Sequence, residues 1–323
     1  MSTYNRLAAI DPGVIFAEVP GVLGFYPTES FVIIGLDIGD KSVAVSPVLR
    51  ADLDVDTLSA TAARMIDHLD IRDYIVIVST TDTQLDMFLD MQSFNLDPIA
   101  VFSTKAVETG SVYQLHSAAT PTLTHAWATG RVAAVHSARM TRETFKRGDV
   151  LEIDRVSAAE KFSHNLDAVP LIALEYAQQT ANELLSRLAN APSGEPTNRI
   201  YREYSNGWRT TDSEDLMAYT LTACSGGSTI RDLYMADVAD DPSNYRQALL
   251  DVARTTDGEV RANALCIYAL VANDSEAMLA LSEAHKADAD HNLTNLLLRM
   301  RQVKPLSTGD LQNAFENVRD SVA

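Results

Sequence analysis

Basic side chains recur at short spacing between residues 125 and 147 of a chain that is otherwise acidic. Guanidinium groups and the first amides of a helix bind phosphate and carboxylate groups, so this segment is the best candidate for an anion site. Thr141 is placed to cap the helix that we expect after it. The alternative is that the arginines pair with the protein's own surplus carboxylates. The expected ligand-binding side chains are Arg131, His136, Ser137, Arg139 and Arg142.

The loop formed by residues 24–30 is a second candidate, because it precedes an apolar run that we expect to be a buried strand. Glu29 and Ser30 could bind a ligand or transfer a proton at the edge of a sheet. The alternative is that Gly24 ends a helix and Ser30 satisfies backbone groups of the loop. For one combined site, both candidates must meet in a cleft beyond the carboxyl ends of the strands.

The elements that position these residues alternate between helices and strands. Asp11 and Pro12 form a helix start, Pro20 interrupts the helix and Gly24 ends it. Strands are expected at 31–36, 42–49, 74–78, 99–102 and 111–115, and helices at 57–69 and 82–94. The alternation predicts an α/β layer with a mixed, largely parallel sheet.

The second half of the chain has a different pattern, with one long helix at 171–188 and a loop at 190–208 that is rich in Pro and Gly. Successive short helices with Ala-rich faces follow, which indicates an all-α part built of helical hairpins. The predicted division is an α/β domain at 1–150, a connecting helix and loop at 151–208, and a helical domain at 209–323. The predicted helices are 213–223, 229–236, 243–254, 259–272, 275–286, 290–301 and 307–319.

The composition excludes several classes of function. The 323 residues carry a net charge of −18, which repels nucleic acid and anionic lipid, so neither is an expected partner. The two cysteines lack the spacing of a disulfide framework or a zinc site, and we expect both to be buried apolar residues. There is no signal-peptide pattern and no run of about 18 apolar residues, so we expect a cytoplasmic protein without membrane contact.

Several acidic clusters fail as metal sites. Residues 52–56 lack the glycine and the glutamate of a calcium loop, and the acids at 82, 86 and 90 are typical of a solvated helix face. The His and Asp residues at 285–291 fall at an expected turn between helices. The sequence also lacks the Walker, dinucleotide-binding, kinase and serine-hydrolase motifs. We therefore predict no metal and no cofactor, and the sequence leaves open whether the chain is an enzyme.

Residues 17–37, AEVPGVLGFYPTESFVIIGLD, resemble the opening of the actinobacterial family called domain of unknown function 4192. The resemblance continues in AWATGRVAAVHSARMTR at 126–142, in Ile230-Arg231-Asp232 and in the helical end at 259–300. The family's Trp and Cys-Cys-Pro patch is replaced here by VYQLHSAAT, so no role of that patch carries over. The family has no established activity, and the resemblance implies an origin in actinobacteria or their phages.

Two hypotheses follow. The first is a non-catalytic cytoplasmic interaction or regulatory protein whose helical part docks a protein partner. The second is a protein or enzyme that binds a small anionic metabolite or nucleotide at the edge of the sheet.

Overall fold

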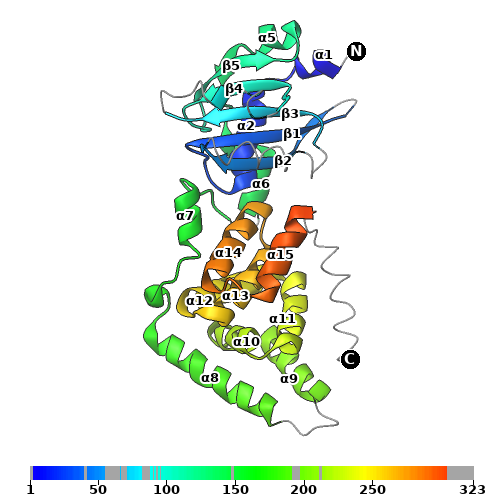
Figure 1. The fold of residues 1–323 in the computed structure, drawn as a ribbon. Helices are drawn as coiled ribbons and strands as arrows, with labels where there is room; N and C mark the ends of the chain where they lie inside the picture. The colour runs from blue at the N-terminus through cyan, green and yellow to red at the C-terminus, as the bar shows by residue number, and fades with distance from the viewer. Residues whose placement is uncertain are drawn as a thin grey trace. The chain divides into compact units, whose positions relative to one another are not determined.

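The computed structural model (Figure 1) describes residues 3–39, 42–54, 66, 71–81, 88–89, 91, 94, 96–146, 149–190, 197–210 and 213–303. The chain divides into two compact units, Met1–Ala158 and Ala159–Ala323. The predicted helices at 57–69, 82–94 and 307–319 lie largely or wholly outside the described residues. The three-part division predicted from the sequence stays a prediction.

Two helices, α1 (Thr3–Leu7) and α2 (Pro12–Leu23), open the first unit. The Asp11 carboxylate accepts a hydrogen bond from Gly13 N at 2.8 Å, and Gly24 ends α2 with a φ of 79°. Both predicted ends are confirmed. The prediction that Pro20 interrupts the helix is wrong, because α2 continues to Leu23. Burial of most of α2 outweighs the one hydrogen bond that Pro20 cannot donate.

The described residues form one six-stranded sheet in the order β2-β1-β3-β4-β5-β6. Only β3 and β4 run parallel, and every other neighbouring pair is antiparallel. The strands are β1 (Ser30–Ile38), β2 (Val43–Asp52), β3 (Tyr74–Ser79), β4 (Ala100–Thr104), β5 (Val112–Ala118) and β6 (Thr129–Arg131).

The sheet is therefore mixed, as predicted, but it is not largely parallel. The connections β1–β2 and β4–β5 are too short for a crossover, so each reverses the direction of the chain. β3 pairs with β1 on the side away from β2, and it also runs antiparallel to β1. Buried apolar runs in a sequence show which segments are strands, but not which strands become neighbours.

Apolar side chains cover both faces of the sheet. On one face, Phe16 of α2 makes edge-to-face contacts with Phe102 and Tyr113, each with ring centroids 5.0 Å apart. On the other face, Phe31 and Val76 belong to a second core.

The remaining elements of this unit are α5 (Pro121–Trp127), the 3-10 helix η1 (Val135–Ser137), α6 (Arg139–Lys146) and α7 (Arg155–Glu160). The last two residues of α7 lie beyond the unit boundary.

The second unit is helical, as predicted. Its elements are the 3-10 helix η2 (Leu166–Ala168), α8 (Leu171–Ala189), α9 (Thr197–Thr210), α10 (Ser213–Ser225), α11 (Ser228–Asp240), α12 (Pro242–Thr255), α13 (Gly258–Val271), α14 (Asp274–Ala287) and α15 (Asn292–Val303). None of the described helices is both long and apolar enough to span a bilayer.

The prediction of a loop over 190–208 is wrong for most of its length, because α9 begins at Thr197. Tyr204 and Trp208 are four residues apart on this helix and both are buried. Gly207 is part of the reason that the helix can pack, since a Cβ there would lie 2.4 Å from the Tyr219 hydroxyl. Tertiary packing thus overrides the low helix propensity of this stretch.

Candidate functional site

The predicted anion segment is held against α2 by contacts between backbones. Ala133 N donates a hydrogen bond to Gly13 O at 3.0 Å. A Cβ on Gly13 would lie 2.0 Å from Arg131 O, and a Cβ on Gly21 would lie 2.2 Å from Thr141 N. Two glycines, eight residues apart on α2, therefore let β6 and α6 approach closely.

Glu18 of α2 occupies the helix terminus where an anion was expected. Its two carboxylate oxygens accept hydrogen bonds from Arg139 N at 3.0 Å and Met140 N at 2.7 Å. These amides open α6, where a negative charge is favoured. The predicted capping role of Thr141 is wrong, because α6 begins two residues earlier. The amides of the anion site exist, but they bind a carboxylate of the protein itself.

The outer face of α6 remains cationic. Arg139 and Arg142 are exposed, and neither guanidinium forms a hydrogen bond or ion pair within the described residues. Lys146 pairs with Glu143, with Nζ 2.8 Å from Oε1. The pKa of the exposed Glu143 carboxyl is lowered, first by its hydrogen bond to Lys146 and further by the charges of Arg139 and Arg142. We call Arg139, Arg142, Phe145 and Lys146 the cationic face.

The other predicted members of this segment are also exposed. Arg131 donates a hydrogen bond to Gly110 O at 2.7 Å from the end of β6. His136 and Ser137 lie in η1, immediately before α6. Chain continuity places these residues near the cationic face, and their role as ligands stays a prediction.

Glu29 binds the residues that follow β3. Its carboxylate accepts hydrogen bonds from the Thr80 hydroxyl at 2.5 Å, and from Thr81 N and the Thr81 hydroxyl at 2.9 Å. Glu29 has a φ of 41°, which is uncommon for a residue other than glycine. The carboxylate therefore ties the start of β1 to the end of β3.

Ser30 is fully buried and has two polar partners. Its hydroxyl donates to Thr28 O at 2.6 Å and accepts from Arg50 Nε at 2.9 Å. Arg50 also pairs with Asp52 at 2.5 Å, and burial lowers the pKa of Arg50 although the charge of Asp52 opposes this shift. The Ser30 hydroxyl thus both donates and accepts a hydrogen bond within the protein. This agrees with the alternative interpretation, in which Ser30 satisfies backbone groups of the loop.

The two candidate segments do not combine into one site. In the register of the sheet, Ser30 pairs with Ser79, Ser79 with Thr104, Thr104 with Tyr113 and Tyr113 with Gly130. Four strand spacings amount to roughly 19 Å. None of the five predicted residues between 131 and 142 forms a hydrogen bond or ion pair with Glu29 or Ser30 in the described part of the chain.

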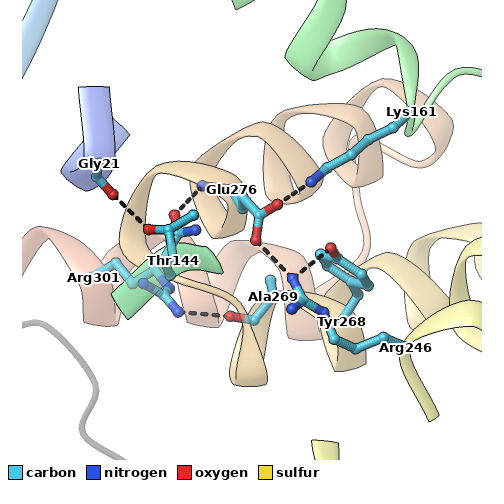
Figure 2. Close-up of polar contacts among 9 residues, drawn as sticks. Gly21, Thr144, Lys161, Arg246, Tyr268, Ala269, Glu276 and Arg301 are labelled. Atoms are coloured by element: carbon cyan, nitrogen blue, oxygen red, sulfur yellow. Dashed lines mark hydrogen bonds and ion pairs between the residues drawn. The ribbon is translucent and has the colours of Figure 1, made fainter. Parts of the chain in front are cut away.

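Two buried threonines on α6 allow a matched test of its packing on α2. The Thr144 hydroxyl donates to Gly21 O at 2.9 Å (Figure 2), whereas the buried Thr141 hydroxyl has no hydrogen-bond partner within the described residues. We expect Thr144→Val to lower the free energy of unfolding by about 1–2 kcal/mol, because it leaves a carbonyl unpaired. Thr141→Val should leave it unchanged or raise it. Urea unfolding of both variants checks this, and equal losses would contradict it.

The polar groups inside the helical unit also bind one another. The buried Asp237 carboxylate accepts hydrogen bonds from Trp208 Nε1 at 2.5 Å and from Arg209. Cys224 and Cys266 are buried thiols, as predicted, and burial raises the pKa of Cys266 to about 12. Such thiols are poor nucleophiles. No group of three or more His, Cys, Asp or Glu in the described residues is arranged to hold a metal ion.

His291, a member of the His and Asp cluster near residue 288, is buried with its Nδ1 2.8 Å from the Thr294 hydroxyl. Burial lowers its pKa, as does the charge of Arg231, while the charges of Asp288 and Glu259 oppose the shift. A lowered folded pKa makes the unfolded state bind more protons below the usual value of 6.5. The histidine therefore contributes stability at neutral pH that is lost as the pH falls.

We expect the free energy of unfolding of the native chain to decrease more between about pH 7.5 and about pH 5 than that of the His291→Asn variant. Urea titrations at several pH values measure this difference, and the carboxylates common to both proteins cancel in the comparison. Parallel pH profiles for the two proteins would contradict the assignment.

Sequence reasoning missed Glu18 and Arg50, which hold the two candidate segments in place. Glu18 lies 121 residues from Arg139 in the chain, and Arg50 lies 20 residues from Ser30. The sequence contains a weak signal for Arg50, since a charged residue facing into a strand pair needs a polar partner. It contains none for Glu18.

The sequence model of a family described as "Domain of unknown function (DUF4192)" matches residues 12–303. No curated protein and no solved structure matches the chain. The matched region includes α2, the whole sheet, the cationic face and the described helices of the second unit through α15. The chain belongs to the family of domain of unknown function 4192.

Proposed function

We propose that this protein is a non-catalytic interaction protein of the cytoplasm, and that it docks a protein partner through exposed apolar side chains of residues 150–176, here called the apolar segment. The segment has one part in each unit, and each part carries exposed apolar side chains of its own. The observation that carries the proposal is the distribution of exposed apolar side chains. Of the fourteen exposed large hydrophobic residues in the described chain, seven lie in the apolar segment. Such a concentration marks an interaction surface more often than single exposed residues do. Two buried free thiols suit a reducing compartment.

The part of the apolar segment in the first unit is anchored. Tyr26 N donates to Glu152 O at 3.1 Å, and Glu152 N donates to Gly24 O at 2.9 Å. Arg155 pairs with Asp52 at 3.3 Å. The exposed side chains of this part are Val150, Ile153 and Val156, and Ile153 is 76% exposed. These three side chains are therefore exposed on a segment that hydrogen bonds and an ion pair hold against the loop after α2 and against β2.

The part of the segment in the second unit is the start of α8. Only Leu174, Ala177 and Ala181 of this helix are buried. The exposed side chains are Leu166, Leu171, Ile172 and Tyr176, and Ile172 is 82% exposed. An apolar side of a helix that is left in water stabilises nothing in the unit itself, so a bound partner is the simplest reason for it.

The negative charge of the apolar segment restricts the classes of partner that it can bind. The apolar segment contains five acidic residues against one Arg and one Lys, a balance of −3. Acidic groups around apolar side chains disfavour an anionic membrane surface. A protein surface with an apolar centre and basic groups at its rim fits this composition.

The sequence placed the docking surface on the helices after residue 209. In the described part of those helices, the exposed large hydrophobic side chains are Met278, Leu296 and Met300. The apolar segment is larger and precedes these helices. We therefore assign docking to residues 150–176 rather than to α14 and α15.

Photo-crosslinking tests the proposal directly. Ile153 or Ile172 is replaced by p-benzoylphenylalanine in the full chain, expressed in the cells that normally contain the protein. We expect one discrete conjugate from each position, and none from matched exposed polar positions, Gln114 on β5 and Gln178 on α8. Equal conjugates from all four positions, or none from 153 and 172, would reject docking through this segment.

The second candidate function is binding of a small anion at Arg139 and Arg142. The absence of ion pairs for these guanidiniums within the described residues favours it, but Glu18 already fills the amides beside them. Pyrophosphate, ATP and citrate serve as probes in thermal-shift and calorimetric titrations. A response that Arg139→Ala and Arg142→Ala remove and Arg299→Ala retains supports the anion site. Equal responses in all three variants argue against it.

A further inference from the structure

We propose that the partner is a second copy of this chain, in which the cationic face of one copy lies on residues 149–156 of the other. This inference rests on the proposed function and names the occupant of the part of the apolar segment that lies in the first unit. The reason is that the chain carries two surface patches of opposite charge, each with an exposed apolar centre. The arginines of the first patch are exposed, and the acids of the second are half-buried.

The cationic face is the basic half of the pair. Between Glu108 and Asp149 the sequence has five Lys or Arg residues and one acid, a balance of +4 in a chain of −18. Phe145 lies among these cations and is 46% exposed. α2 packs closely against α6 at Gly21 and binds its first amides through Glu18, so the face is presented on a helix that is fixed to α2.

The acidic half follows in the chain. Residues 149–156 contain Asp149, Glu152 and Asp154 against Arg155, and Arg155 is already paired with Asp52. Val150, Ile153 and Val156 supply the apolar centre. Phe145 on one copy and Ile153 on the other thus provide an apolar contact with complementary charges around it.

Within one copy, Asp154 accepts a hydrogen bond from Ser157 N at 2.8 Å, but in the described residues the cationic face does not neutralise Glu152 or Asp154. Neither Arg139 nor Arg142 forms an ion pair with Glu152 or Asp154 in the described residues, although about ten residues separate them in the chain. Two copies related by a two-fold axis can make both contacts at once, because each patch then meets its complement. This arrangement closes as a dimer.

Other ligands fit the cationic face less well. Glu18 occupies the α6 amides that would bind a small phosphate, and a phosphate makes no use of an exposed phenylalanine. The net charge of −18 opposes approach to nucleic acid. A second copy supplies both the carboxylates and the apolar side chains.

Sedimentation equilibrium of the purified full chain gives the first measurement. We expect a dimer whose dissociation constant rises at least tenfold in Arg139→Glu/Arg142→Glu and in Glu152→Arg/Asp154→Arg, and rises with salt because the contacts are charged. The double exchange that carries all four substitutions restores the charge complementarity and should recover the dimer to within about threefold. Circular dichroism and thermal unfolding check that each variant is folded. The acidic variant is expected to be folded but less stable, because Glu152 and Asp154 are half-buried and Asp154 accepts a hydrogen bond from Ser157 N at 2.8 Å.

Crosslinking separates this inference from the proposed function. With p-benzoylphenylalanine in place of Ile153, a conjugate of twice the chain mass of 35.2 kDa supports the second copy. A conjugate of another mass overturns the second copy and leaves the proposed function standing. No conjugate in pure protein or in cells overturns both. A dimer that persists unchanged in both charge-reversed variants also overturns the inference.

Discussion

Glu276→Ala is expected to lower the free energy of unfolding by about 3 kcal/mol, because it removes the buried carboxylate that two partly buried cations share. The carboxylate is buried and accepts hydrogen bonds from Lys161 and, at 2.8 Å, from Arg246 (Figure 2). Arg246 also donates to the Tyr268 hydroxyl at 2.9 Å. Burial opposes a charged Lys161, yet the charge of Glu276 raises the lysine's pKa above its usual value.

An exposed pair of the same type is the control for this variant. Glu143 pairs with Lys146 at 2.8 Å on the surface of α6, and exposed pairs contribute about 0–1 kcal/mol. Glu143→Ala should therefore change the unfolding free energy little. Guanidinium unfolding followed by far-UV circular dichroism measures both variants. Similar small losses would mean that water reaches the Glu276 cluster and screens it.

Gly21→Ala is expected to lower the free energy of unfolding by about 3 kcal/mol, at the upper end of the usual cost of overpacking. The added Cβ would lie 2.2 Å from Thr141 N and 2.5 Å from Met140 C. Both atoms belong to the backbone of α6, so no side chain can turn away to make room. Relief requires α6 to move away from α2, which weakens the contacts of Glu18 and Thr144.

Gly39→Ala provides the comparison, because a Cβ there would meet its nearest atom at 3.4 Å, an ordinary contact. We expect a change of about 0.5 kcal/mol or less for this surface position. Thermal unfolding of both variants under one buffer decides the matter. If Gly21→Ala unfolds at the same temperature as Gly39→Ala, α2 and α6 are not in the close contact described here.

Local elements were predictable because their signals are local. Asp11 before Pro12 marks the start of α2, and Gly24 adopts the left-handed conformation that ends it. The apolar run 31–36 is the centre of β1, and the run 74–78 is most of β3. Periodicity also located the helices α8 and α10 to α15. Each of these signals depends on residues a few positions apart, and a sequence displays such neighbours directly.

The family was also visible in the sequence, since short motifs spread over residues 17–300 indicated the group that the family match confirms. The candidate site was less predictable. Reading the residues identified the cationic segment but not Glu18, and Ser30 but not Arg50. A partner that is 121 residues away leaves no mark in the local pattern.

The sequence by itself determined the ends of α2, the helices α8 and α10 to α15, the buried strands and the excess of negative charge, because these follow from local spacing and from composition. Only the tertiary structure decided the direction of the strands, the occupant of the α6 amides and the exposure of Ile153 and Ile172. Those properties depend on which distant segments meet, since burial and pairing are fixed by packing between elements. The type of an apolar residue does not show whether the fold buries its side chain or leaves it exposed to water.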